Sequence, residues 1–276
     1  MRTVCALVVV CAAVSFSAGL SGQAPSKKKV LCIGQVKGFQ HDSVTYGLAS
    51  IWKWGQETGL YDTYIRTDCE LVTKKELPNN AKNLDWFDAV VFYTTGELDM
   101  DDSQKADLLS FVRDDGKGFV GVHSAPDTFY KWPEYGEMIG GYFDGHPWNT
   151  FKAPIVIEDP NSPMTKHFKA GEIVVNDEIY QVRDWSRDKV RVLMRLNEDK
   201  LDLTNETIKP RIKRADKDWA VTWIKSYGKG RVFYSTLGHT YEAWDNKNVA
   251  KMYLEGVKWA LGLTEANTSS HSKPAK

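Results

Sequence analysis

The sequence lacks a net charge, because 36 lysine and arginine residues balance 36 aspartate and glutamate residues. A chain without a basic excess has no electrostatic attraction for nucleic acid or for an anionic membrane, so we expect neither as a partner. The chain has no P-loop lysine, and Gly34 after the first predicted strand is not followed by a second glycine at dinucleotide spacing, so we expect no nucleotide. HExxH and CxxC patterns are also absent, so no local spacing assigns a metal.

Cysteine is scarce, with four residues in a chain of 276. Cys5 and Cys11 fall in an N-terminal hydrophobic segment, which leaves Cys32 and Cys69 in two different predicted strands. Free cysteine is among the most buried residue types, so we expect two buried thiols. A disulfide is the alternative in an oxidising compartment.

The apolar run at the N-terminus, residues 4–14, is too short to span a bilayer. It follows Met1 and Arg2 and precedes small residues that end at Ala24, which is the pattern of a secretory signal peptide. We therefore predict a signal peptide over residues 1–24 and a periplasmic or secreted location. A buried N-terminal strand is the alternative interpretation.

The remainder of the chain contains no internal repeat and no linker rich in proline, glycine or serine, so we expect a single domain over residues 25–264. Small and polar residues dominate residues 265–276, which predicts a disordered tail. The sequence gives no indication of the oligomeric state.

Short apolar runs alternate with helical patterns along this domain. Residues 30–34, 87–93 and 118–123 are apolar without polar alternation, which is typical of strands buried on both faces. This alternation predicts βαβ units, and hence an α/β fold with a mainly parallel sheet and helices on both faces. Further strands are expected at residues 61–67, 155–157, 173–175, 190–196, 220–224 and 230–235, the middle four as possible antiparallel additions. Helices are expected at residues 43–59, 102–113, 132–140 and 246–262, with a glycine-rich loop at 141–148.

Three histidines follow predicted strands: His41, His123 and His239. In an open α/β sheet the ligand crevice lies outside the carboxyl ends of the strands, so we expect these imidazoles to meet there. His146, in the glycine-rich loop, is expected beside them. Glu178, from the middle of the chain, is a candidate carboxylate to orient or ligate beside them, with a solvated turn as the alternative interpretation.

Two uses of these imidazoles stay open. Neutral imidazoles can bind a divalent metal such as zinc, with a carboxylate completing the shell. Alternatively, one histidine acts as a general acid or base while the others bind hydroxyl groups. The metal hypothesis selects His41, His123, His146, His239 and Glu178.

For catalysis we select His123 and His239 together with Asp127, which follows His123 by four residues. The ordinary role of an aspartate in such a loop is to form a turn or cap a helix. Ser124 is a weaker candidate for a nucleophile, because histidine occupies the central position of what would be a G-x-S-x-G elbow.

Aromatic residues are abundant, with ten tryptophans and twelve tyrosines. A flat apolar ring matches the C–H face of a sugar, although core packing is the more common role. We select Trp132, Trp148, Tyr180 and Trp244, together with His41, as candidate residues for substrate binding.

Four ordered segments resemble the motifs of the ThuA-like (trehalose utilisation) family, and the resemblance covers about residues 29–262. The segments are Gly118-Phe-Val-Gly-Val-His123-Ser-Ala-Pro-Asp127-Thr, Gly140-Gly-Tyr-Phe-Asp-Gly-His146-Pro, Asp177-Glu178-Ile-Tyr180 and Tyr227-Gly-Lys-Gly-Arg231-Val-Phe-Tyr-Ser-Thr-Leu-Gly238-His239. The resemblance implies a flavodoxin-like fold, similar to that of class I glutamine amidotransferases. Amidotransferase chemistry does not follow, because the matching elbow is His123-Ser124 and carries no nucleophilic cysteine.

The resemblance also implies an activity and a substrate class. We expect an exported carbohydrate-active protein that takes a small sugar and cleaves a glycoside or 3-keto-glycoside, by hydrolysis or elimination. A 3-keto group acidifies the neighbouring C2–H, so that a histidine can remove the proton. A non-catalytic sugar-binding protein on the same scaffold is the alternative.

Overall fold

The computed structural model describes residues 26–168 and 171–274, so the predicted signal peptide lies outside the described residues. The strands are β1 Lys28–Ile33, β2 Tyr61–Arg66, β3 Ala89–Phe92, β4 Gly118–Val122, β5 Tyr142–Phe143, β6 Thr150–Ile157, β7 Glu172–Glu178, β8 Val182–Arg183, β9 Arg191–Leu196, β10 Ala220–Tyr227 and β11 Gly230–Ser235. The α-helices are α1 Ser43–Thr58, α2 Asp102–Arg113, α3 Pro133–Ile139, α4 Tyr241–Asp245 and α5 Lys247–Ala260. Short 3-10 helices are η1 Leu84–Trp86, η2 Arg187–Lys189, η3 Glu198–Lys200 and η4 Lys209–Arg211.

Nine strands form one sheet in the order β2-β1-β3-β4-β11-β10-β9-β6-β7. The first five strands in this order pair in parallel, and their arrangement matches the 2-1-3-4-5 order of flavodoxin-like folds, with β11 in the fifth position. The remaining pairings are antiparallel, as anticipated for the middle strands. The α/β, flavodoxin-like prediction is therefore confirmed.

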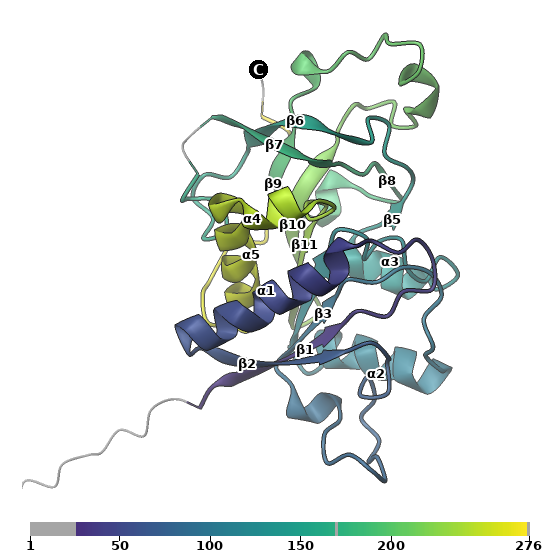
Figure 1. The fold of residues 1–276 in the computed structure, drawn as a ribbon, viewed down its shortest axis with the longest axis vertical. Coiled ribbons are helices and arrows are strands. Elements are labelled where there is room, and N and C mark those ends of the chain that lie inside the picture. Colours follow the sequence, from purple (N-terminus) through teal and green to yellow (C-terminus); the bar gives the residue numbers. More distant parts are fainter. Residues whose placement is uncertain (1–25, 169–170, 275–276) are drawn as a thin grey trace, which may run out of the picture.

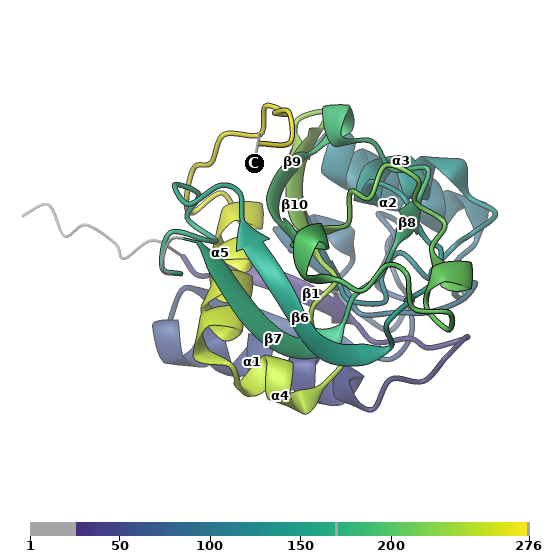
Figure 2. The same cartoon turned by 90° about the horizontal axis from the view of Figure 1, so that it is seen from above.

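Helices cover both faces of the sheet (Figures 1 and 2). Buried residues of α1, α4 and α5 pack in one hydrophobic cluster with the strands, and those of α2 and α3 pack in a second cluster. The predicted apolar positions of the last helix, such as Met252 and Trp259, are buried. None of the helices in the described ranges is both long and apolar enough to cross a lipid bilayer.

Local signals set the helix boundaries. Helix α1 ends at Gly59, whose left-handed φ of 67° is the conformation that glycine adopts without strain. Helix α2 spans the predicted residues 102–113, and Asp101 caps it: its side chain accepts a hydrogen bond from the backbone N–H of Gln104, and the two residues form a capping box. The helix α4 was not predicted, because five residues are too few to show a helical period.

The antiparallel part of the sheet contains longer strands than the sequence predicts. Strands β6 and β7 pair along most of their length, from Thr150 opposite Glu178 to Val156 opposite Glu172. The expected glycine-rich loop contains β5, which pairs with β8 as a separate two-stranded sheet. Strand pairing at these positions depends on distant partners, which a local pattern does not reveal.

The C-terminal residues 265–274 have no regular secondary structure but are held against β9. Arg191 donates to the carbonyl of Ser269 at 3.0 Å, and His271 Nε2 donates to the carbonyl of Val192 at 2.9 Å. These contacts tie part of the tail to the sheet, and the disorder expected for residues 265–276 stays a prediction. The composition of the tail shows its low apolar content, but it does not reveal these hydrogen-bond partners.

Both remaining cysteines are free and buried, as expected. Cys32 lies in β1, whereas Cys69 follows β2 instead of lying within a strand. Burial raises the pKa of each thiol, that of Cys69 to about 12. Neither sulfur is therefore a thiolate nucleophile at neutral pH.

Replacing Gly47 of α1 by alanine should destabilise the protein, because a Cβ atom at this position would overlap the indole ring of Trp244. Overpacking of this kind costs about 1–3 kcal/mol, against a gain of at most about 1 kcal/mol in helix propensity. Urea unfolding measures the change, and Gln56→Ala on the exposed side of the same helix is the control. An unchanged or increased free energy of unfolding for Gly47→Ala would contradict the packing of α1 on α4.

Candidate active site

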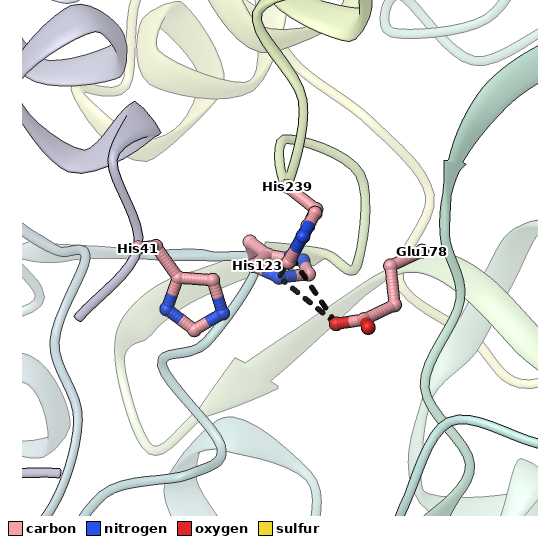
Figure 3. A group of neighbouring side chains, drawn as sticks. All are labelled: His41, His123, Glu178 and His239. Carbon is pink, nitrogen blue, oxygen red and sulfur yellow. Dashed lines mark hydrogen bonds and ion pairs between the residues drawn. The ribbon is translucent and has the colours of Figure 1, made fainter. Parts of the chain in front are cut away.

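Four side chains from four separate elements meet at the carboxyl edge of the parallel strands. His41 precedes α1, His123 follows β4, His239 follows β11, and Glu178 is the last residue of β7. We call these residues the histidine–glutamate cluster (Figure 3). Each residue contributes one nitrogen or oxygen atom to a group in which all four atoms lie within 4.8 Å of one another.

The carboxylate of Glu178 lies against the imidazoles of His123 and His239. His239 Nδ1 lies 3.2 Å from Glu178 Oε2 and 3.2 Å from His123 Nε2. His123 Nε2 lies 3.7 Å from the same carboxylate oxygen. The ring of His41 is perpendicular to both other rings, with centroids 4.8 Å from His123 and 5.2 Å from His239.

The backbone fixes the direction of His123. This residue has a left-handed φ of 41°, which is strained for a residue with a side chain and is a feature of functional sites. Its Nδ1 donates a 2.5 Å hydrogen bond to the carbonyl of Thr236, so the proton resides on Nδ1. The lone pair of Nε2 therefore points into the cluster.

A second buried carboxylate, that of Asp177, holds the segment that carries His239. It accepts hydrogen bonds from the backbone N–H of Gly238 at 2.6 Å and of Thr240 at 3.1 Å. Burial raises the pKa of Asp177 to about 7. Because β7 places Asp177 and Glu178 side by side, one residue positions the His239 backbone and the next contacts its ring.

Burial and the carboxylate of Glu178 together give the three imidazoles different charges. Desolvation, reinforced by His239, lowers the pKa of His41 to about 4, and desolvation lowers the pKa of His123 well below its usual value. The hydrogen bond with Glu178 raises the pKa of His239 above 6.5. His41 and His123 are therefore neutral at physiological pH and carry free lone pairs, as metal ligands must.

The donor set fits a divalent metal of the zinc type. Three imidazoles and one carboxylate are ligands that zinc prefers, and tetrahedral coordination at about 2.0–2.1 Å places ligand atoms about 3.3 Å apart. The separations of 3.2 Å and 3.7 Å among His123, His239 and Glu178 are close to this value. The carbonyl of Thr236 supplies the outer hydrogen bond that orients a ligating histidine.

His146 and Tyr180 adjoin the cluster. His146 Nδ1 lies 3.2 Å from Glu178 Oε1, the oxygen that does not face His239, and its side chain is half-buried. The hydroxyl of Tyr180 lies 3.0 Å from His123 Nε2 and 3.3 Å from His41 Nε2, and its ring is fully buried. The structure thus places His146 in contact with the cluster, although His146 is not one of its four members.

Asp127 lies in the loop after β4, yet the structure does not place it in the cluster. Its carboxylate accepts a hydrogen bond from Tyr130, and its backbone carbonyl accepts one from Gly96. Burial raises the pKa of Asp127. Ser124 Oγ is buried without a hydrogen-bond partner, so no base activates it as a nucleophile.

The tryptophans selected from the sequence do not provide open rings. Trp244 is only 3% exposed and stacks on Tyr253, and Trp132 stacks on Tyr135 in the core. Trp148 is half-buried and packs edge-on against Trp219. The prediction of sugar stacking on Trp132 and Trp244 is therefore corrected, because hydrophobic burial uses both ring faces. Thr236 and Asp177 were not selected from the sequence, since their roles depend on strand ends that only the folded sheet brings together.

The fold and the cluster define a flavodoxin-like protein with a histidine–carboxylate site at the carboxyl edge of its parallel strands. The family model described as "ThuA: Trehalose utilisation" matches residues 29–260. The chain therefore belongs to the ThuA family.

Two solved structures of putative ThuA-like proteins share the fold. The protein from Bacteroides uniformis is 18% identical, with a TM-score of 0.69 over 87% of this chain and 94% of that chain. The protein from Parabacteroides merdae is also 18% identical, with a TM-score of 0.62 over 89% of this chain and 98% of that chain. No curated protein matches the sequence.

In chelator-treated protein, imidazole NMR titration should give three separate behaviours. At pH 6.5 His239 should be more than half protonated, whereas His41 and His123 should be neutral. Glu178→Gln should lower the pKa of His239, because the carboxylate is the main cause of its increase. Glu57→Gln, on the exposed surface of α1, is the matched control. Protonation of His41 or His123 near pH 6.5 would contradict the burial of their rings.

Proposed function

We propose that this protein is an exported carbohydrate-active enzyme that cleaves a glycoside or 3-keto-glycoside at a divalent-metal site. The observation that carries the proposal is the histidine–glutamate cluster, with two neutral imidazoles and a carboxylate facing one another at the ligand-binding edge of the fold. Membership of a family described by trehalose utilisation supports a sugar as the substrate. The proposal of export rests on the signal-peptide pattern of residues 1–24.

In this proposal His41, His123, His239 and Glu178 hold the metal, zinc being the best fit to the donor set. A bound divalent ion supplies a Lewis acid for a substrate oxygen. The chain itself supplies the fixed positions of the donors. Thr236 orients the ring of His123, and Asp177 fixes the backbone on either side of His239.

Proton transfer falls to groups beside the cluster. His146 contacts the outer oxygen of Glu178 and is accessible to solvent, and Asp127 lies on the neighbouring loop. For a 3-keto-glycoside, one of these groups removes the C2 proton, and the electron pair forms a C1–C2 double bond as the C1–O bond breaks. The departing alcohol takes up a proton from the other group, which acts as the general acid. Hydrolysis of a simple glycoside would use the same two groups to activate water and protonate the leaving oxygen.

Glutamine hydrolysis is not part of the proposal, although the fold is shared with class I glutamine amidotransferases. That reaction needs a cysteine thiolate at the strand-to-helix elbow, where this chain has His123. Cys32 and Cys69 are buried, with raised pKa values. The remaining competitor is a sugar-binding protein without catalysis, which predicts binding but no product.

Purified protein should contain about one divalent metal per chain and should turn over a member of a panel of glycosides and 3-keto-glycosides. Glu178→Gln and His123→Ala should each reduce kcat/KM by at least about 100-fold, because each removes a metal ligand. Elemental analysis and product detection by mass spectrometry measure the two effects. His167→Gln is the matched control, since His167 is not a member of the cluster and bonds to the carbonyl of Asn248.

Sugar binding by native protein without product from any panel member would favour the binding-protein alternative. Full activity after complete removal of metal by chelator would defeat the metal site while leaving an acid–base mechanism.

Zinc should also stabilise the fold, because the ion binds the assembled site and not the separated residues of the unfolded chain. At a free concentration 100-fold above Kd, the expected gain is about 2.7 kcal/mol in the free energy of unfolding. Thermal unfolding with and without zinc measures this gain. The gain should be largely lost in Glu178→Gln and retained in His167→Gln. Equal stabilisation of both variants would show that zinc binds elsewhere.

A further inference from the structure

One exposed aromatic ring lies next to the histidine–glutamate cluster and has no packing role that explains it. Phe39 is 65% exposed, the highest value among the exposed large hydrophobic residues in the described part of the chain. Its ring contacts His41 edge-to-face, with centroids 4.8 Å apart. Leaving a phenylalanine in water forgoes most of the free energy that burial of its ring would contribute.

The backbone of Phe39 is nevertheless held in place by the buried residue Thr95. Thr95 Oγ1 donates to the carbonyl of Phe39 at 3.0 Å and accepts from the N–H of Gly38 at 3.2 Å. The carbonyl of Thr95 accepts from the N–H of Lys37 at 2.8 Å. Three hydrogen bonds thus fix residues 37–39, while the side chain of Phe39 is exposed to solvent.

The close approach of two loops completes this support. A Cβ atom at Gly96, which has a φ of 80°, would lie 2.7 Å from the backbone carbon of Lys37. Glycine is therefore required where the loop after β3 meets the loop after β1. The same Gly96 bonds to the loop of Asp127 through its N–H, so the support of Phe39 and the loop after β4 form one connected rim.

We propose that Phe39 is the stacking platform for a pyranose ring of the substrate, and that it sets the preference of the site for cyclic glycosides. This inference rests on the proposed function. A rigid, exposed aromatic ring one side chain away from His41 would bind the apolar C–H face of a sugar whose reacting carbon lies at the cluster. The backbone of Phe39 is already fixed by Thr95, which lowers the conformational entropy lost on binding. Trp132 and Trp244 are buried and do not compete for this role.

The test measures the affinity of zinc-loaded protein for trehalose and for methyl glucoside by calorimetry. Phe39→Ala should raise Kd about tenfold, the upper range of an aromatic contact, and Phe39→Trp should restore it. Trp86→Ala is the matched control, because Trp86 is 42% exposed but precedes β3, at the opposite edge of the parallel strands. Metal content and thermal stability should be unchanged in all three variants.

An unchanged Kd in Phe39→Ala would overturn the inference, as would an equal loss in Trp86→Ala or a failure of tryptophan to restore binding. Absence of binding of either sugar to native protein would overturn it as well. Failure of the stacking platform can be distinguished from failure of the proposed enzymatic function. Binding that depends on Phe39 without turnover would leave this platform standing and remove only the enzymatic activity, whereas turnover with unchanged affinity would remove only the platform.

Discussion

The site depends on one buried carboxylate. Glu178 is only 6% exposed, and a charged group removed from water in this way needs polar partners. Its two oxygens contact His239 and His146, with His123 slightly further away. These histidines come from separate segments of the chain, so the carboxylate joins segments that the sequence keeps far apart. Removing it would leave the imidazoles facing one another without a counter-charge.

The topology explains how Glu178 reaches this position. Strand β7 is at the far edge of the nine-stranded sheet, five places from β4, which leads to His123. Antiparallel pairing and twist carry the β6–β7 hairpin across one end of the sheet (Figure 1), so that its last residues meet the loops after β4 and β11. Asp177 secures this contact through the backbone of Gly238 and Thr240. The antiparallel strands therefore supply Glu178 to a site whose histidines follow parallel strands.

Much of this arrangement could be predicted from the sequence, and the remainder has identifiable causes. Apolar runs ending in His123 and preceding His239 located the carboxyl edge, because buried parallel strands have a clear local pattern. Glu178 could be selected but not placed, since its position depends on pairing between β6 and β7. The roles of Trp132 and Trp244 were wrong because local sequence does not distinguish a buried ring from an open one. Phe39 was missed for the same reason, its exposure being a property of the loop that Thr95 supports.

The central claim is that the three imidazoles and Glu178 form a single metal-binding centre. Anomalous X-ray diffraction at the zinc absorption edge, from crystals of protein purified without added metal and then supplied with one equivalent of zinc, tests it directly. We expect one strong anomalous peak, bonded at about 2.0–2.2 Å to His41, His123, His239 and Glu178. A peak at another position, or no ordered peak while the four side chains keep their places, would contradict it.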